Sequence, residues 1–195
     1  MDSRQFLFDY LNSDSPTGHE VPGQKLWLDY TKNFVDEQFT DTYGSAVSVI
    51  NPQAPYKVVI EAHVDEISWY INYINDKGYI YVIRNGGSDY QIAPSKKALI
   101  HTSKGKIPAI FGWPAIHVRD NKTEAKFDIE TVTLDCGATS KKEVEEMGIH
   151  VGCVVTFDDN LIELNKKYLV GRALDNRMGG YMIAEAAKRI RENNI

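Results

Sequence analysis

The sequence changes its structural character twice along its 195 residues. Residues 1–66 and 163–195 mix helically spaced apolar residues with β-branched runs, which is typical of an α/β fold. Residues 67–162 instead consist mostly of short strand-like segments separated by turn-forming residues. A middle segment of a different class favours an insertion into a parent domain. The sequence therefore predicts an α/β core, built from the two outer stretches, that is interrupted by a small inserted β-rich domain.

The outer stretches predict helices and strands in alternation. The spacing of Phe6, Tyr10 and Leu11 predicts an amphipathic helix at the start of the chain. Helices are expected over residues 3–12, 19–34 and 176–192, and strands over 45–50, 57–63 and 167–172. The segment 57–63 is apolar and β-branched at its centre, which is typical of a strand covered on both faces.

The middle stretch predicts a series of short strands joined by tight turns. Strands are expected over residues 67–74, 79–84, 97–102, 107–112, 130–136 and 151–157, with a long polar loop over 113–128. One short helix interrupts them: Ser140 and Glu143 have the spacing of a capping box, and Gly148 lies where the helix would end.

The composition is that of an ordinary soluble globular protein, with 43% hydrophobic and 25% charged residues. The 22 basic and 27 acidic residues give a net charge of −5, which argues against a nucleic-acid partner. No apolar stretch approaches the ~18 residues that span a bilayer, so no membrane partner is expected. The first residues lack a secretory pattern, so the expected location is the cytoplasm. There, Cys136 and Cys153 are expected to remain buried thiols.

His63 and Asp65 follow the predicted strand 57–63 at its carboxyl end, where open α/β sheets bind their ligands. An imidazole at such an edge can ligate a metal through one nitrogen while a carboxylate two residues further on holds the other nitrogen. The same spacing is compatible with a hydrogen-bonded structural histidine beside solvated acids. The two residues alone leave both interpretations open.

Asp175 lies in the segment Gly171-Arg172-Ala173-Leu174-Asp175-Asn176-Arg177, where a predicted strand leads into a predicted helix. A carboxylate at this position can cap the helix by accepting from its free N–H groups. Alternatively, it can bridge two metal ions ~3.5–4 Å apart, with Arg177 in the outer shell of the site. Both interpretations stay open on this segment alone.

Several motifs taken together narrow these choices. They are Ser15-Pro16-Thr17-Gly18-His19-Glu20, Ala62-His63-Val64-Asp65-Glu66-Ile67, Gly86-Gly87-Ser88-Asp89, Leu99-Ile100-His101-Thr102, Lys104-Gly105-Lys106-Ile107-Pro108-Ala109-Ile110, Asp135-Cys136-Gly137-Ala138-Thr139-Ser140 and Val170-Gly171-Arg172-Ala173-Leu174-Asp175-Asn176-Arg177. In this order, and over nearly the whole chain, they resemble the glutamyl aminopeptidase family of dinuclear metallopeptidases, which includes the tetrahedral (TET) aminopeptidases.

The resemblance implies a mixed-sheet metallopeptidase core whose inserted β-rich domain makes the contacts of a homo-oligomer. It implies removal of N-terminal residues from peptides with two divalent metal ions, either zinc or cobalt. By the same resemblance, His63 would be a terminal ligand on one ion and Asp175 would bridge both. Asp65 would be the catalytic residue that orients His63 through its other nitrogen.

The chain departs from the family in its extent. Family members run to roughly twice this length, judged against a typical domain of ~150 residues, and their second half supplies a Glu-Glu pair, an Asp and a final His. After Asp175 this sequence offers only Glu185 and Glu192 as acids. The resemblance thus implies that the core is incomplete and that the general base and remaining ligands are absent. We expect these 195 residues alone to bind zinc weakly, to show little peptidase activity and to expose apolar faces.

Two other functions remain as alternatives. The chain could be a non-catalytic assembly module that uses residues 67–162 to contact a partner. It could also be a glycoside hydrolase with paired acids among Glu61, Asp65 and Glu66. The glycoside hydrolase is the less favoured alternative, because neighbouring side chains on a strand point to opposite faces and do not readily flank one sugar bond.

Overall fold

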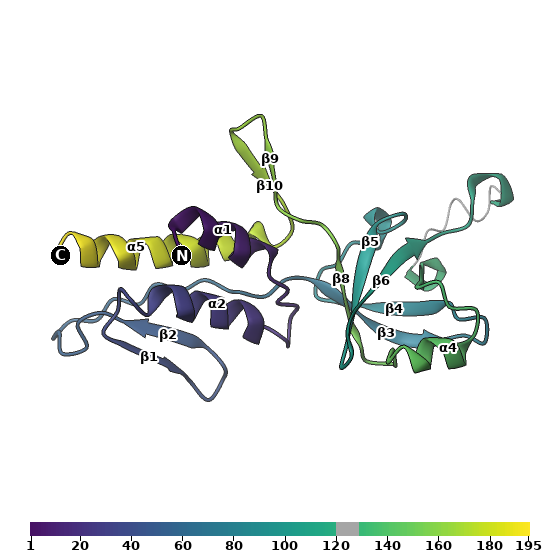
Figure 1. Ribbon diagram of the computed structural model, residues 1–195, viewed down its shortest axis with the longest axis horizontal. Helices are drawn as coiled ribbons and strands as arrows, with labels where there is room; N and C mark the ends of the chain where they lie inside the picture. Colours follow the sequence, from purple (N-terminus) through teal and green to yellow (C-terminus); the bar gives the residue numbers. More distant parts are fainter. Residues whose placement is uncertain (120–128) are drawn as a thin grey trace. The chain divides into compact units, whose positions relative to one another are not determined.

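The computed structural model describes residues 1–119 and 129–195 of the chain (Figure 1). The chain forms two compact units. The first unit consists of Met1–Glu66 together with Asn160–Ile195, and the second unit consists of Ile67–Asp159. Each unit has its own cluster of buried apolar side chains.

The first unit contains three α-helices. They are α1 (Ser3–Asn12), α2 (Val21–Thr31) and α5 (Leu174–Glu192). The predicted helices over 3–12, 19–34 and 176–192 are therefore confirmed, although α2 is shorter at both ends. Pro22 lies in the first turn of α2, where the N–H that proline lacks would have no acceptor within the helix.

An aromatic cluster holds these three helices together. Phe6 of α1 is fully buried, and its ring stacks on Tyr30 of α2 with centroids 3.9 Å apart. Gly180 lets the backbone of α5 approach closely, because a Cβ at this position would stand 2.6 Å from the hydroxyl oxygen of Tyr10. The carbonyl of Gly180 also accepts a 2.9 Å hydrogen bond from the indole N–H of Trp27. The start of α5 is thereby held firmly against α1 and α2.

Two antiparallel hairpins complete the regular structure of the first unit. One pairs β1 (Glu37–Thr40) with β2 (Ala46–Val49), and the other pairs β9 (Ile162–Leu164) with β10 (Tyr168–Val170). The strands predicted over 45–50 and 167–172 are confirmed as β2 and β10. The sequence did not predict β1 and β9, because every residue of these two strands is exposed and no buried face imposes an alternating pattern.

The buried strand predicted over residues 57–63 is not formed, and that prediction is wrong. Val58, Val59 and Ile60 are 72%, 84% and 64% exposed. No backbone hydrogen bond joins 57–63 to any other residue that the structure describes. The apolar run has the composition of a central strand, but a strand is buried only where neighbouring strands and covering helices exist.

The mixed sheet predicted for the core is likewise not present in the described part of the first unit. Its two hairpins are antiparallel, and the only parallel pairing among the described residues is a single bridge between Pro16 and Glu66. The mixed sheet is absent for the same reason that residues 57–63 are exposed: no described strand lies beside this run to pair with it.

The exposure of 57–63 leads to a prediction for hydrogen exchange. We expect the backbone amides of Val58, Val59 and Ile60 to exchange nearly as fast as in an unstructured peptide, because no hydrogen bond or burial protects them. The amides of Leu99 and Ile100, paired within a sheet, serve as the protected reference in the same sample. Strong protection of 57–63 in the isolated chain would contradict the unpaired conformation.

Six antiparallel strands of the second unit close into a barrel in the order β3–β4–β7–β6–β5–β8. The strands are β3 (Ser68–Ile74), β4 (Ile80–Asn85), β5 (Lys97–Thr102), β6 (Gly105–Gly112), β7 (Thr133–Asp135) and β8 (Val154–Phe157). All six correspond to predicted strands, and β7 and β8 are shorter than expected. Closure into a barrel leaves no unpaired outer edge of the kind that an open sheet exposes.

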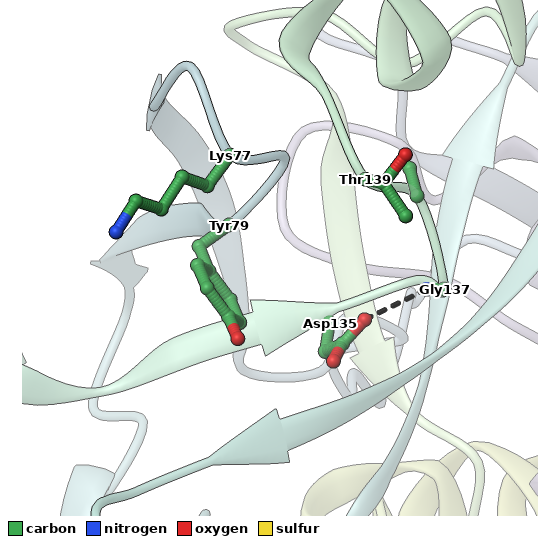
Figure 2. A pocket seen from close by; sticks show the side chains of 6 residues that line it. Lys77, Tyr79, Asp135, Gly137 and Thr139 are labelled. Carbon is green, nitrogen blue, oxygen red and sulfur yellow. Dashed lines mark hydrogen bonds between the residues drawn. The ribbon is translucent and has the colours of Figure 1, made fainter.

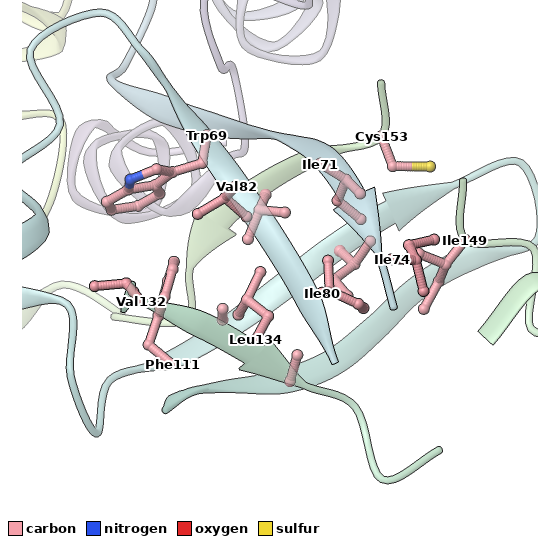
Figure 3. Packing of buried hydrophobic residues seen from close by; sticks show 14 of the residues in the cluster. Trp69, Ile71, Ile74, Ile80, Val82, Phe111, Val132, Leu134, Ile149 and Cys153 are labelled. Carbon is pink, nitrogen blue, oxygen red and sulfur yellow. The ribbon is translucent and has the colours of Figure 1, made fainter. Parts of the chain in front are cut away.

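The barrel interior is filled by alternating side chains from its strands (Figure 3). Trp69 is 1% exposed, and its ring centroid lies 4.9 Å from that of Phe111 and 4.5 Å from that of Phe157. Ile80 and Leu134 are fully buried in the same cluster. Buried residues alternate with more exposed ones along β4 and β5, and this alternation produces the period-2 pattern in those parts of the sequence.

One α-helix lies between the last two strands of the barrel, α4 (Lys141–Glu146). Ser140 caps it by accepting a hydrogen bond from the backbone N–H of Glu143, as the capping-box spacing predicts. Three short 3-10 turns also occur, η1 (Tyr90–Ile92), η2 (Ile116–Val118) and η3 (Ile129–Thr131). The long polar loop predicted over 113–128 falls largely outside the described residues, which end at 119 and resume at 129.

Two further expectations concern the whole described chain. Cys136 and Cys153 are both free thiols, but only Cys153 is buried as expected, whereas Cys136 is partly exposed. Desolvation raises the pKa of Cys136. Among the described helices, none has both the length and the apolar character needed to cross a bilayer.

Candidate metal centre

The segment that carries His63 is anchored where it leaves the unpaired stretch. The N–H of Glu66 donates to the carbonyl of Ser15 over 2.9 Å, and the N–H of Thr17 donates to the carbonyl of Glu66 over 3.1 Å. All of these residues belong to the first unit. This short parallel bridge fixes the backbone a few residues beyond His63.

The three predicted site residues lie together. The Nδ1 atom of His63 is 2.9 Å from Oδ1 of Asp65, and its Nε2 atom is 3.2 Å from Oδ1 of Asp175. A carboxylate can only accept a hydrogen bond, so the contact with Asp65 suits the tautomer that carries its ring proton on Nδ1. In that tautomer the lone pair of Nε2 would be available to a metal ion lying between His63 and Asp175.

Thr17 orients Asp65 in turn. Its hydroxyl donates to Oδ2 of Asp65 over 2.5 Å and also lies 3.2 Å from the carbonyl oxygen of Glu66. Asp65 therefore has one oxygen on the imidazole and the other on Thr17. Sequence reasoning did not single out Thr17, although it lies in one of the motifs that carry the family resemblance.

Asp175 lies at the start of α5 but does not cap it. Its backbone is non-helical, and the peptide bond that joins it to Asn176 is cis. The side chain of Asn176 caps the first turn instead, because its Oδ1 accepts from the N–H of Gly179 over 3.2 Å. The Asp175 side chain is 97% exposed. Apart from the contact with His63, its carboxylate faces solvent and no described N–H of the helix donates to it, so the helix-cap interpretation does not apply.

The distance between the two donor atoms fits a shared cation. Zinc binds imidazole nitrogen and carboxylate oxygen at about 2.0–2.2 Å, so two such ligands at a tetrahedral angle lie about 3.3 Å apart. The observed distance from His63 Nε2 to Asp175 Oδ1 is 3.2 Å. The residues present therefore suit a borderline divalent ion that takes nitrogen and oxygen ligands, such as zinc or cobalt.

These residues do not complete a coordination shell. Within residues 1–119 and 129–195, no group of three or more His, Cys, Asp or Glu side chains could hold a metal ion. Asp65 is turned toward Nδ1 rather than toward the metal-facing side of His63. The candidate site thus offers two ligand residues, and a tetrahedral ion needs others in addition.

Glu66 is not available for acid–base chemistry on a sugar. Its side chain is 3% exposed and lies between two guanidinium groups, with Oε1 2.9 Å from Nη2 of Arg177 and Oε2 bound to Nη1 of Arg172. Burial lowers the pKa of Arg177, and the carboxylate of Glu66 opposes that shift. The Glu61, Asp65 and Glu66 set predicted for a glycoside hydrolase is therefore not assembled, because Glu66 is already paired.

An open depression in the second unit is the other candidate (Figure 2). Its volume is about 340 Å³, and its lining consists of Lys77, Tyr79, Asp135, Gly137, Ala138 and Thr139. The Asp135 carboxylate accepts from the N–H of Gly137 over 2.7 Å, and the Thr139 hydroxyl donates to Glu143 over 3.1 Å. These polar groups already stabilise their own loop, so the depression gives no indication of a ligand.

Comparisons with known proteins identify a peptidase family for this chain. A family model described as M42 glutamyl aminopeptidase matches residues 44–195. The lysyl aminopeptidase of Pyrococcus furiosus is 30% identical over 186 residues, which cover 94% of this chain and 54% of that protein. The chain spans about half the length of the curated relatives it matches.

Solved structures share the fold. A TET aminopeptidase from a marine sediment Thaumarchaeota archaeon superposes with a TM-score of 0.93 at 23% identity, over 99% of this chain and 55% of that one. A TET peptidase of Pyrococcus horikoshii superposes with a TM-score of 0.86 at 24% identity, over 98% of this chain and 57% of that one. With a family model that covers most of its residues, including His63 and Asp175, this chain belongs to the M42 glutamyl aminopeptidase family.

Proposed function

We propose that residues 1–195 are part of a metal-dependent aminopeptidase that removes N-terminal residues from peptides at a dinuclear metal site. The observation that carries the proposal is the array Asp65–His63–Asp175, with successive distances of 2.9 and 3.2 Å. Membership of the M42 family and the aminopeptidase named among the relatives support the same reaction.

Each residue has a distinct role in this proposal. His63 is a terminal ligand through Nε2, and the exposed Asp175 carboxylate has an oxygen for each of two ions. Asp65 acts as the catalytic residue that keeps His63 in the metal-binding tautomer, and Thr17 keeps Asp65 in place. A pair of zinc or cobalt ions would polarise the scissile carbonyl and supply a hydroxide nucleophile.

The remaining ligands and the general base would come from polypeptide outside these 195 residues. The exposed run 57–63 supports this view, because its composition suits a central strand and strands placed beside it would end near His63. We further propose that residues 67–159 are an inserted domain that makes homo-oligomer contacts. The Pyrococcus horikoshii relative is described as assembling into a tetrahedron or a large octahedral shell.

A zinc titration tests the proposal on the chain itself. We expect weak binding, with affinity lowered at least tenfold by His63→Ala or Asp175→Asn, because each removes one of only two ligands. His117→Ala, which changes an exposed histidine of the second unit, should leave the affinity unchanged. Calorimetry or competition with a zinc dye measures all four proteins.

Two outcomes would contradict this account. Zinc affinity that survives His63→Ala would remove the proposed metal site. Tight stoichiometric zinc together with robust aminopeptidase turnover by the 195-residue chain would show that no further ligands are needed. If neither the parent chain nor His63→Ala binds zinc and both assemble equally well, the result would instead favour a non-catalytic assembly module.

A further inference from the structure

Arg177 links the two segments that carry the donor atoms of the candidate metal centre. Its side chain is fully buried and begins two residues after Asp175. Its Nε donates to the carbonyl of Val64 over 2.9 Å, directly beside His63. Its Nη2 donates to Oε1 of Glu66 over 2.9 Å. One planar guanidinium therefore binds the His63 segment at two points.

The same guanidinium also binds the end of α1. Its Nη1 lies 3.3 Å from the carbonyl oxygen of Tyr10 and 3.4 Å from that of Leu11, and it donates to the carbonyl of Ser13. These carbonyls lie at the helix C-terminus, where intrahelical partners are lacking and a positive charge is favourable. Arg177 thus joins three stretches of chain that are distant in sequence.

The donor atoms themselves have little packing to hold them. The side chain of His63 is 53% exposed and that of Asp175 is 97% exposed. Their 3.2 Å separation must therefore be set mainly by the backbones that carry them. Arg177 is the buried group that connects those backbones through direct hydrogen bonds.

We propose that Arg177 is a positioning residue that sets the spacing between His63 Nε2 and Asp175 for metal binding. This inference rests on the proposed function, because it concerns the same pair of ligands. Lysine cannot replace arginine here, since an ammonium has three donors on one atom whereas the guanidinium fork reaches Val64, Glu66 and Ser13 at once.

Arg172 provides a matched control. It binds the other oxygen of Glu66 and pairs with Asp14 over 3.0 Å, and its side chain is only 13% exposed. Unlike Arg177, it makes no hydrogen bond with Val64 or with His63 in the part of the chain that the structure describes. A purely structural role would make the two arginines equivalent.

The test compares Arg177→Lys with Arg172→Lys in the 195-residue protein. The ¹⁵N signals of the His63 ring are followed by NMR during titration with Zn²⁺, at a temperature where circular dichroism shows both variants folded. We expect Arg177→Lys to weaken Zn²⁺ binding about 10–100-fold and to shift the metal-free His63 signals. Arg172→Lys should change the Zn²⁺ affinity less than about threefold. Outer residues change metal affinity about 10–100-fold only when they orient a metal ligand, and Arg172 makes no hydrogen bond with the described His63 backbone segment at Val64.

Zn²⁺ affinity and His63 signals unchanged in folded Arg177→Lys would overturn the inference. If Arg177→Lys does not fold, Glu66→Gln decides, because it keeps the shape of the Arg177 partner and weakens the link. A folded Glu66→Gln protein with parental affinity and His63 signals would also overturn it. His63→Ala separates a failure of this inference from a failure of the proposed function. If His63→Ala loses Zn²⁺ binding and Arg177→Lys keeps it, only the positioning role of Arg177 is rejected.

Discussion

Replacing Trp69 by alanine is expected to lower the free energy of unfolding of the second unit by about 3–5 kcal/mol, the usual loss for a large buried aromatic side chain. Trp69 is 1% exposed, and it contacts both Phe111 and Phe157 in the barrel interior. Its removal would leave a cavity lined by aromatic rings that a closed barrel cannot collapse to fill. The slowest exchanging amides of β5 report this free energy for the second unit alone.

Tyr73 on the same strand is the control for this prediction. Its side chain is 54% exposed, so Tyr73→Ala should change the same free energy by less than about 1 kcal/mol. Equal effects of the two substitutions would contradict the assignment of Trp69 to the core and Tyr73 to the outer face of the barrel.

Glu66→Ala is expected to destabilise the first unit by a comparable amount, about 3–5 kcal/mol, because it removes the anion from a buried ion pair. The substitution would leave the guanidinium groups of Arg172 and Arg177 without their shared carboxylate. Arg177 is fully buried, so water cannot easily replace the lost partner. Protection of the slowest amides in α1 and α5 measures the loss.

Glu61→Ala tests whether that effect belongs to the pair. Glu61 is an exposed acid in the same stretch of chain, and its removal should change the stability of the first unit by less than about 0.5 kcal/mol. A loss for Glu66→Ala no larger than that for Glu61→Ala would mean that the ion pairs contribute little to the fold.

The sequence predicted the elements whose signals are local. The helix α4 follows from Ser140 and Glu143, because a capping box is defined by neighbours three residues apart. The barrel strands follow from alternation around residues such as Ile80 and Ile100, whose side chains point into a core while their neighbours do not. The contact between His63 and Asp65 was also within reach, since the two residues are only two positions apart.

The failed predictions depended on partners that the sequence does not specify locally. Residues 57–63 look like a buried strand, yet burial is a property of the neighbouring strands rather than of the run itself. The strands β1 and β9 are exposed on both sides, so they lack the alternation that pattern reasoning needs. Each case turns on tertiary surroundings rather than on intrinsic preference.

The candidate site was predicted only in part for the same reason. His63 and Asp175 are 112 positions apart, so no local pattern predicts that they lie close together. Their proximity was expected only from the family resemblance. The pairing of Arg177 with Glu66 spans 111 positions, and no short-range pattern links them. Thr17, 48 positions before Asp65, became visible only once the bridge between Pro16 and Glu66 was known.

The central claim is that His63 and Asp175 share a metal ion. Anomalous diffraction at the zinc edge, from crystals of the protein grown with Zn²⁺, tests it most directly. We predict a peak about 2.0–2.2 Å from both His63 Nε2 and a carboxylate oxygen of Asp175, with the contact between Nδ1 and Asp65 retained. A map in which zinc occupies other side chains, with no peak between His63 and Asp175, would contradict the account.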